Sequence, residues 1–133
     1  MYRNGDGVPE EDVEAVRWWR LAAEQGYALS QYSLGVAYGQ GRGVPEDIVE
    51  AVRWTRLAAE QGHAAAQNIL GMGYATGQGV PEDMVFAYMW LNLSAAQGNE
   101  AGQNNKDSLE EHMTREQIAE AQRLSREWLE AHP

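Results

Sequence analysis

The chain has 133 residues, with 20 acidic against 10 basic side chains, a formal net charge of −10 and no cysteine. This charge opposes contact with phosphate backbones and anionic membrane surfaces, so we expect no nucleic-acid partner. Without cysteine there is no disulfide framework, thiolate nucleophile or cysteine-based zinc site, and without a run of 18 apolar residues we expect no membrane insertion.

One pattern of residues occurs three times along the chain. The tripeptide Val-Pro-Glu begins at Val8, Val44 and Val80, so the offset between copies is 36 residues. Such a period is typical of stacked helical arrays, in which each unit buries its apolar face against its neighbours. We therefore predict one all-α solenoid domain, residues 1–133, built from helix-turn-helix repeats. Its expected parts are a partial repeat over 1–26, repeats over 27–62 and 63–98, and a terminal helix pair or cap over 99–133.

The expected helices, in chain order, cover 11–25, 28–39, 47–61, 64–75, 83–97, 100–111 and 115–130. Gly-x-Gly turns join them, because glycine accepts the positive φ that ends a helix and proline suits the start of the next one. The repeated turn segments Tyr38–Val44 and Tyr74–Val80 have their upstream counterpart in Tyr2–Val8, at the start of the sequence. We therefore expect the chain to begin inside a repeat, without that repeat's short helix. Asp47 and Glu50 are placed for a capping box.

One tryptophan recurs at the same position in each long helix. Trp18, Trp54 and Trp90 occupy equivalent places on the apolar face of the long helices, so we expect all three in the core. Trp19 has no aromatic equivalent in the other repeats, which indicates a non-core or terminal site.

Two features distinguish the short helices and the third long helix. Gly35 and Gly71 each cost about 1 kcal/mol in helix propensity relative to alanine, so close helix crossings are expected there. In the third long helix apolar residues replace polar ones, which indicates either burial under the C-terminal helix or an exposed apolar groove. The replacements are Glu50 by Phe86, Arg53 by Met89 and Thr55 by Leu91.

The C-terminal helix has its own start signal. Thr114 and Gln117 have the spacing of a capping box, and Met113 and Ile118 that of a hydrophobic staple. One side of this helix is apolar and the other charged, so it is expected to cap the array.

These residues resemble the Sel-one-like repeat family, a relative of the tetratricopeptide α-solenoids. The resemblance rests on the pattern Ala66-Gln67-x-x-Leu70-Gly71-x-x-Tyr74-x-x-Gly77-x-Gly79-Val80 and its copies, over residues 1 to about 103. It implies a right-handed α–α superhelix that acts as an adaptor or scaffold for protein complexes. It also implies a bacterial protein, often one near the envelope or in signalling. The compartment, cytoplasm or periplasm, is left open, since no leader sequence is evident in the chain.

The chain offers no motif for chemistry. His63, His112 and His132 lack a second ligand at metal-binding spacing. The Gly-x-Gly turns lack the third glycine and the lysine of phosphate-binding loops. Glu46 and Asp47 stand at a helix start, where carboxylates complement the helix dipole. We therefore expect no catalytic, cofactor-binding or metal-binding residue and no cofactor, so an enzyme is the least favoured hypothesis.

The first functional hypothesis is an interaction module for a protein or peptide, bound on the concave face, whose acidic rims favour neutral or basic segments. Residues on the side of the short helices opposite the core differ between repeats, as a surface that recognises side chains would, although an unconstrained solvent face would differ too. The candidate partner-binding residues are Leu29, Tyr32, Val36, Asn68 and Met72, with Tyr32 as the main anchor because aromatic side chains dominate interface energies.

The second hypothesis is self-assembly. A long helix without a preceding short helix exposes apolar area, here around Val13, Val16, Trp18 and Trp19. Solenoids need polar terminal caps, so an uncapped end predicts a homodimer or an end-to-end stack.

Overall fold

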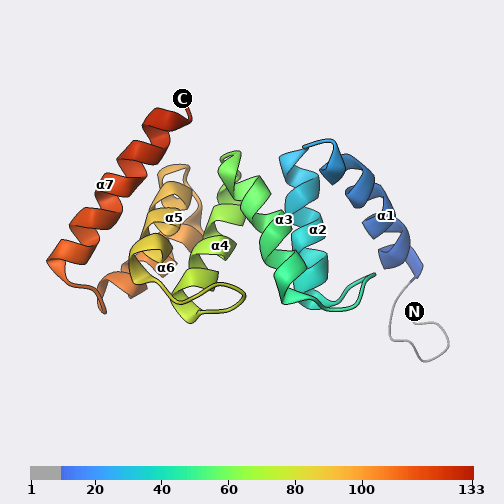
Figure 1. The fold of residues 1–133 in the computed structure, drawn as a ribbon, viewed down its shortest axis with the longest axis horizontal. Helices are drawn as coiled ribbons and strands as arrows, with labels where there is room; N and C mark the ends of the chain where they lie inside the picture. The colour runs from blue at the N-terminus through green and yellow to red at the C-terminus, as the bar shows by residue number, and fades with distance from the viewer. Residues whose placement is uncertain (1–9) are drawn as a thin grey trace. The chain divides into compact units, whose positions relative to one another are not determined.

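The computed structural model describes residues 10–133, and this part of the chain consists of helices without a strand (Figure 1). Each of the expected helices is present, with its ends within a few residues of the prediction. The part of the partial repeat that lies in residues 1–9, with the turn at Tyr2–Val8, falls outside the described residues. The helices are α1 (Glu10–Glu24), α2 (Ala28–Gln40), α3 (Ile48–Glu60), α4 (Ala64–Thr76), α5 (Met84–Ala96), α6 (Glu100–Glu110) and α7 (Arg115–Ala131).

The helices form two compact units, the first ending at Gln61 and the second comprising Gly62–Pro133. In the first unit α2 packs against both α1 and α3. In the second unit α5 packs against α4, α6 and α7. These packed long and short helices confirm the predicted all-α solenoid. Gly41 ends α2 and Gly77 ends α4 with φ values of 67° and 75°, as the Gly-x-Gly turns predict.

Aspartate caps begin the long helices α3 and α5. Asp47 Oδ1 accepts a hydrogen bond from the backbone N–H of Glu50 at 3.2 Å, and Asp83 Oδ1 accepts one from that of Phe86 at 3.0 Å. Such a cap is worth about 1 kcal/mol. The structure shows only this half of the capping box expected at Asp47. The carboxylate of Glu50 instead pairs with Arg53 at 3.2 Å, because the arginine lies one turn further along the exposed side of α3.

Helical glycines mark two of the close crossings between helices. A Cβ atom added at Gly35 would lie 2.5 Å from Thr55 Oγ1, and one added at Gly71 would lie 2.8 Å from Leu91 Cγ. The expected close crossings are therefore confirmed, α2 on α3 and α4 on α5. The gain in packing offsets the poor helix propensity of glycine.

A pair of glutamines ties each short helix to the end of the following long helix. Gln61 Nε2 donates to the carbonyl oxygen of Gly26 and to Gln31 Oε1, both at 2.8 Å. The equivalent bond of the second unit joins Gln97 Nε2 to Gln67 Oε1 at 2.9 Å. Because Gln31 and Gln67 are buried, these bonds satisfy polar atoms that water does not reach.

The equivalent tryptophans differ in burial. Trp54 and Trp90 are each 5% exposed, as expected for the core. Trp18 is 62% exposed, so the prediction that it lies in the core is wrong, whereas the exposure expected of it on α1 is found. Trp54 belongs to a cluster with Leu34 of α2, and Trp90 meets Trp128 of α7 edge-on with ring centroids 6.0 Å apart. No described helix covers Trp18 in this way.

Helix α7 begins and packs as its sequence indicates. The reciprocal capping box of Thr114 and Gln117 is formed. Ala121 is fully buried in a cluster shared with α5 and α6, and Met113 and Ile118 pack against the same cluster. The apolar side of α7 therefore covers α5.

The three apolar replacements in α5 have different environments. Met89 and Leu91 are buried, whereas Phe86 remains partly exposed beside Tyr74, with ring centroids 5.6 Å apart. Leu91 shares the cluster that α7 covers, but it also touches Gly71 of α4. Burial thus accounts for the replacements at Met89 and Leu91 but not for the one at Phe86.

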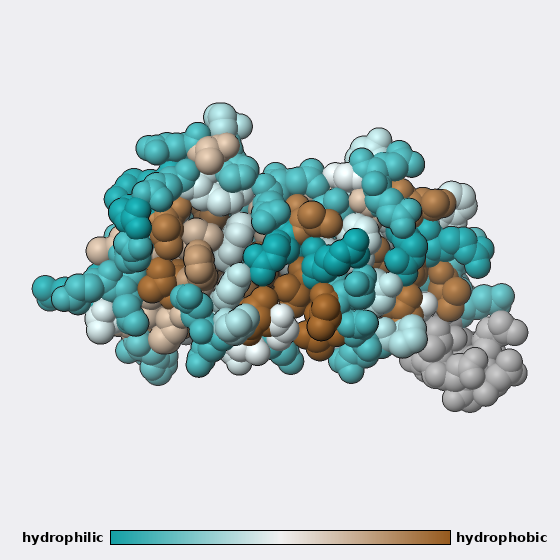
Figure 2. All heavy atoms as spheres, in the orientation of Figure 1, coloured by the Kyte–Doolittle hydropathy of each residue, from teal (hydrophilic) through white to brown (hydrophobic). Residues whose placement is uncertain are grey.

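Hydrophobic side chains lie among hydrophilic ones on the face shown in Figure 2. None of the described helices is both long enough and apolar enough to cross a membrane.

Candidate functional site

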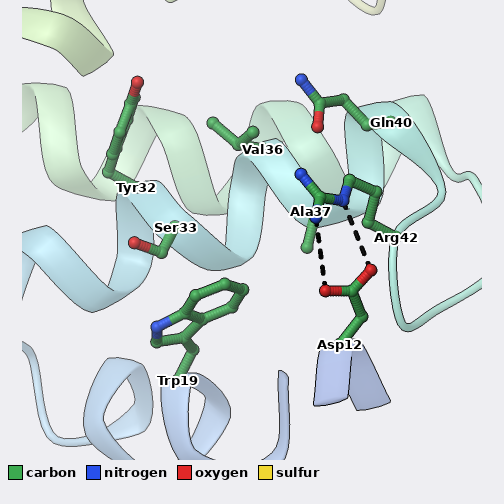
Figure 3. Close-up of a pocket in the computed structure, with 8 residues that line it drawn as sticks. All are labelled: Asp12, Trp19, Tyr32, Ser33, Val36, Ala37, Gln40 and Arg42. Atoms are coloured by element: carbon green, nitrogen blue, oxygen red, sulfur yellow. Dashed lines mark hydrogen bonds and ion pairs between the residues drawn. The ribbon is translucent and has the colours of Figure 1, made fainter. Parts of the chain in front are cut away.

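An open cavity of about 180 Å³ lies between α1 and α2 in the first unit (Figure 3). Sites for small molecules usually measure about 300–1,000 Å³, so this cavity suits a single side chain better than a cofactor. Its wall is mostly apolar, with polar groups at one end. The lining residues are Asp12, Trp19, Tyr32, Ser33, Val36, Ala37, Gln40 and Arg42.

Helix α2 supplies one wall. Tyr32 and Val36 lie one turn apart, so both side chains face the same side of the helix. The other side of α2 carries Gln31 and Leu34, which are buried in the core and fix the rotation of the helix. Leu29 also precedes Val36 on the cavity side, but it is 66% exposed and does not line the cavity.

Helix α1 supplies the opposite wall through Trp19. This indole is partly buried and packs against the cluster of Val16, Leu34 and Ala37. The sequence predicts Trp19 on a non-core, self-associating surface, and in the structure its indole lines the cavity together with Tyr32. The expectation that Val16 is exposed is wrong, because Val16 packs with Leu34 and Ala37 of α2 and is only 4% exposed.

The other two residues of the expected self-associating surface are accessible. Val13 and Trp18 are exposed on α1, and so is Leu21, one turn beyond Trp18. These three apolar side chains lie outside the cavity.

An ion pair closes the polar end of the cavity. Arg42 donates from Nε to Asp12 Oδ2 at 3.4 Å and from Nη2 to Asp12 Oδ1 at 3.3 Å (Figure 3). The turn that carries Arg42 lies against the first turn of α1. At Gly43, with φ at 79°, an added Cβ would lie 2.4 Å from the carbonyl oxygen of Asp12. Sequence reasoning missed this pair, because the equivalents of Asp12 are Ile48 and Met84 and the repeat gives no signal for it.

The remaining candidate partner-binding residues lie in the second unit. Asn68, the equivalent of Tyr32, accepts a hydrogen bond on Oδ1 from Asn105 Nδ2 of α6 at 2.8 Å. Met72, the equivalent of Val36, is partly buried against the cluster that contains Ala87 and Leu109. Both side chains therefore have partners within their own unit.

Two titratable groups with shifted pKa values are structural. His63 Nδ1 accepts the backbone N–H of Ala66 at 3.2 Å and caps α4, and desolvation by burial lowers its pKa. The hydroxyl of Tyr88 donates to Glu110 Oε2 at 2.7 Å. Burial of the phenol, followed by its hydrogen bond to the Glu110 carboxylate, raises the pKa of Tyr88 to about 12. Within residues 10–133, no three His, Asp or Glu side chains are grouped to hold a metal ion.

Known proteins share both the sequence pattern and the fold. The family model of the Sel1 repeat matches residues 1–27, 28–63 and 64–99. A protective antigen of uropathogenic Escherichia coli strains that displays an SLR fold is 39% identical, with a TM-score of 0.87 over 91% of this chain and 26% of that one. A Sel1 repeat protein from Oxalobacter formigenes is 36% identical, with a TM-score of 0.68 over 71% of this chain and 39% of that one. No curated protein matches significantly.

This chain thus spans well under half the length of either solved relative. Sel1 repeat proteins generally serve as scaffolds for protein interactions and are typically not catalysts. The three matched segments follow the 36-residue period of the sequence and the packed helix pairs of the structure, and the chain therefore belongs to the Sel1 repeat family.

Proposed function

We propose that this chain is an interaction scaffold that binds a protein or peptide by accepting one of the partner's side chains between α1 and α2. The observation that carries the proposal is the meeting of Trp19, Tyr32 and Val36 around one open cavity. Aromatic side chains in partly closed pockets contribute most of the binding energy at interfaces. No reaction is proposed, because the family is typically non-catalytic.

The partner is expected to continue along α2. Leu29 is exposed on the cavity side of this helix, one turn before Tyr32 and Ser33. An exposed leucine beside an aromatic pocket gives a second apolar contact for a bound segment. A peptide with two anchor side chains would therefore contact both Leu29 and the cavity.

Peptides selected from a displayed random library on the immobilised protein test this proposal. Each selected peptide is synthesised, and its Kd is measured by fluorescence anisotropy against the wild type and variants. Tyr32→Ala should weaken binding by about 2 kcal/mol, roughly thirtyfold, as truncation of an interface anchor does. Leu21→Ala is the matched control, because Leu21 is an exposed apolar residue of α1 outside the cavity.

Binding that is lost with Leu21→Ala and kept with Tyr32→Ala would contradict the proposal. Val36→Ala gives a second test of the same wall. It should weaken binding less than Tyr32→Ala, because it removes less contact area.

Self-association is the second candidate function. Trp18 is exposed, whereas the equivalent Trp54 and Trp90 are buried, so a second copy of the chain would supply the missing cover. Light scattering coupled to size exclusion should show a concentration-dependent dimer that Trp18→Glu converts to a monomer. Trp18 is the residue to change, because Trp19 lies in the cavity wall. A wild-type monomer at every concentration would refute self-association.

A further inference from the structure

The ion pair at the end of the cavity has a loose geometry. Its two N–O distances, 3.3 and 3.4 Å, exceed the 2.7–2.9 Å that is usual for charged hydrogen bonds. The side chain of Arg42 is 64% exposed, whereas that of Asp12 is only 21% exposed. An exposed pair of this kind stabilises a protein little, so Arg42 can leave Asp12 at small cost.

The groups around Asp12 suit a guanidinium side chain. The carboxylate of Asp12 offers both oxygens to a planar fork, as its two bonds to Arg42 show. The rings of Trp19 and Tyr32 line the same cavity, and aromatic faces attract cations. Val36 adds an aliphatic surface for the stem of a long charged side chain.

The charge of the first unit favours the same class of partner. Residues 10–61 contain nine acidic side chains against five arginines and no lysine. Several of these arginines have partners already: Arg20 donates to the hydroxyl of Tyr38 at 2.7 Å, and Arg53 pairs with Glu50. The resulting negative potential attracts basic segments and disfavours acidic ones.

We propose that the cavity recognises an arginine side chain of the partner, which displaces Arg42 from Asp12. Arg42 thus occupies the carboxylate until the partner arrives and competes with it. Gly43 keeps the backbone of this turn against α1, so only the side chain of Arg42 has to move. This inference rests on the proposed function, because the arginine must belong to a segment bound at the cavity.

The first probe is a pair of peptides. Each peptide selected by its dependence on Tyr32 is synthesised in two forms, with its arginine and with the neutral isostere citrulline. We expect an arginine in these peptides, and we expect citrulline to weaken binding at least tenfold. Lysine at that position should bind between the two, because it has the charge without the planar fork.

The second probe is the direction in which two substitutions in the protein change the Kd of the arginine peptide. Asp12→Asn should weaken binding of the arginine peptide at least tenfold. Arg42→Ala should strengthen it by about two- to fivefold, because the competing side chain is gone. Glu50→Gln and Arg53→Ala are matched controls that change the same charges in an ion pair outside the cavity, and they should leave the Kd unchanged. Circular dichroism melting checks that each variant is folded.

The outcomes separate the two proposals. Peptides that depend on Tyr32 but tolerate citrulline or Asp12→Asn would overturn the arginine inference and leave the proposed function standing. Weaker binding with Arg42→Ala would also overturn the inference, since Arg42 would then be a contact rather than a competitor. Peptides whose Kd is unchanged by Tyr32→Ala would overturn both proposals.

Discussion

The substitution Gly71→Ala tests the close crossing of α4 on α5. An alanine Cβ at this site would lie 2.8 Å from Leu91 Cγ, 2.9 Å from Leu91 Cδ2 and 3.1 Å from the carbonyl oxygen of Ala87. Cγ is the branch point of a buried side chain, and the carbonyl belongs to the backbone of α5. Neither can move away without shifting the helix, so the substitution overpacks the core.

Two opposing effects determine how Gly71→Ala changes the free energy of unfolding. Replacing glycine by alanine within a helix stabilises it by about 1 kcal/mol. Overpacking a filled core costs about 1–3 kcal/mol, and contacts below 3 Å belong to the upper part of that range. We therefore expect Gly71→Ala to lower the free energy of unfolding by about 1–2 kcal/mol.

Gly39→Ala is the matched control. The nearest atom to its added Cβ is Ala51 Cβ at 3.7 Å, an ordinary contact. The equivalent position in the next repeat is Ala75, so the repeat already accepts alanine there. This variant should gain about 1 kcal/mol, because only the propensity term remains.

Urea unfolding followed by circular dichroism at 222 nm measures both variants against the wild type. The two midpoints should move in opposite directions at an unchanged m-value. Leu91→Ala should also cost less in the Gly71→Ala background than alone, because it removes the overlap. A Gly71→Ala variant as stable as Gly39→Ala would refute the steric reasoning.

Three further substitutions test polar contacts. His63→Asn replaces the histidine cap of α4 by one that does not titrate. Because burial lowers the pKa of His63, the wild type should lose stability relative to this variant as the pH falls below about 6.5. Equal pH profiles of the two proteins in melting experiments would contradict the burial of this imidazole. Tyr88→Phe should lower the free energy of unfolding, measured with urea at pH 7, by about 1.5 kcal/mol. The wild type should lose stability as the pH rises from about 10 to about 12, because the pKa of Tyr88 is raised, and the variant should not. Gln97→Leu removes the hydrogen bond to buried Gln67 and should lower the free energy of unfolding by about 1–3 kcal/mol. Gln103→Leu, at an exposed position of α6, should change it by less than about 0.5 kcal/mol.

Much of the fold was predictable because its signals are local. The start of α7 follows from Thr114 and Gln117, whose side chains contact backbone groups only three residues away. The close approach at Gly71 was predictable too, because a glycine inside a helix has a cost that only packing offsets. The bond between Gln97 and Gln67 was not predicted, although both glutamines recur with the repeat. Recurrence marks such residues as structural without showing which atoms meet.

The candidate site was predictable only in part. Tyr32 and Val36 follow from the helical spacing, which places them on the side of α2 opposite its core residues. Their partner across the cavity was assigned elsewhere, because Trp19 has no aromatic equivalent in the other repeats. A comparison of equivalent positions finds what the repeats share, so it misses a wall that only one repeat has.

The helices, their turns and the 36-residue unit can be derived from the sequence alone, because each rests on periodicity and on contacts within a few residues. Which of Trp18 and Trp19 is covered depends on tertiary packing. Neighbouring side chains point about 100° apart on a helix, so the position of α2 sets which indole is covered. The contact between Asp12 and Arg42, 30 residues apart in the sequence, likewise depends on tertiary packing, because it forms only where the turn after α2 meets α1.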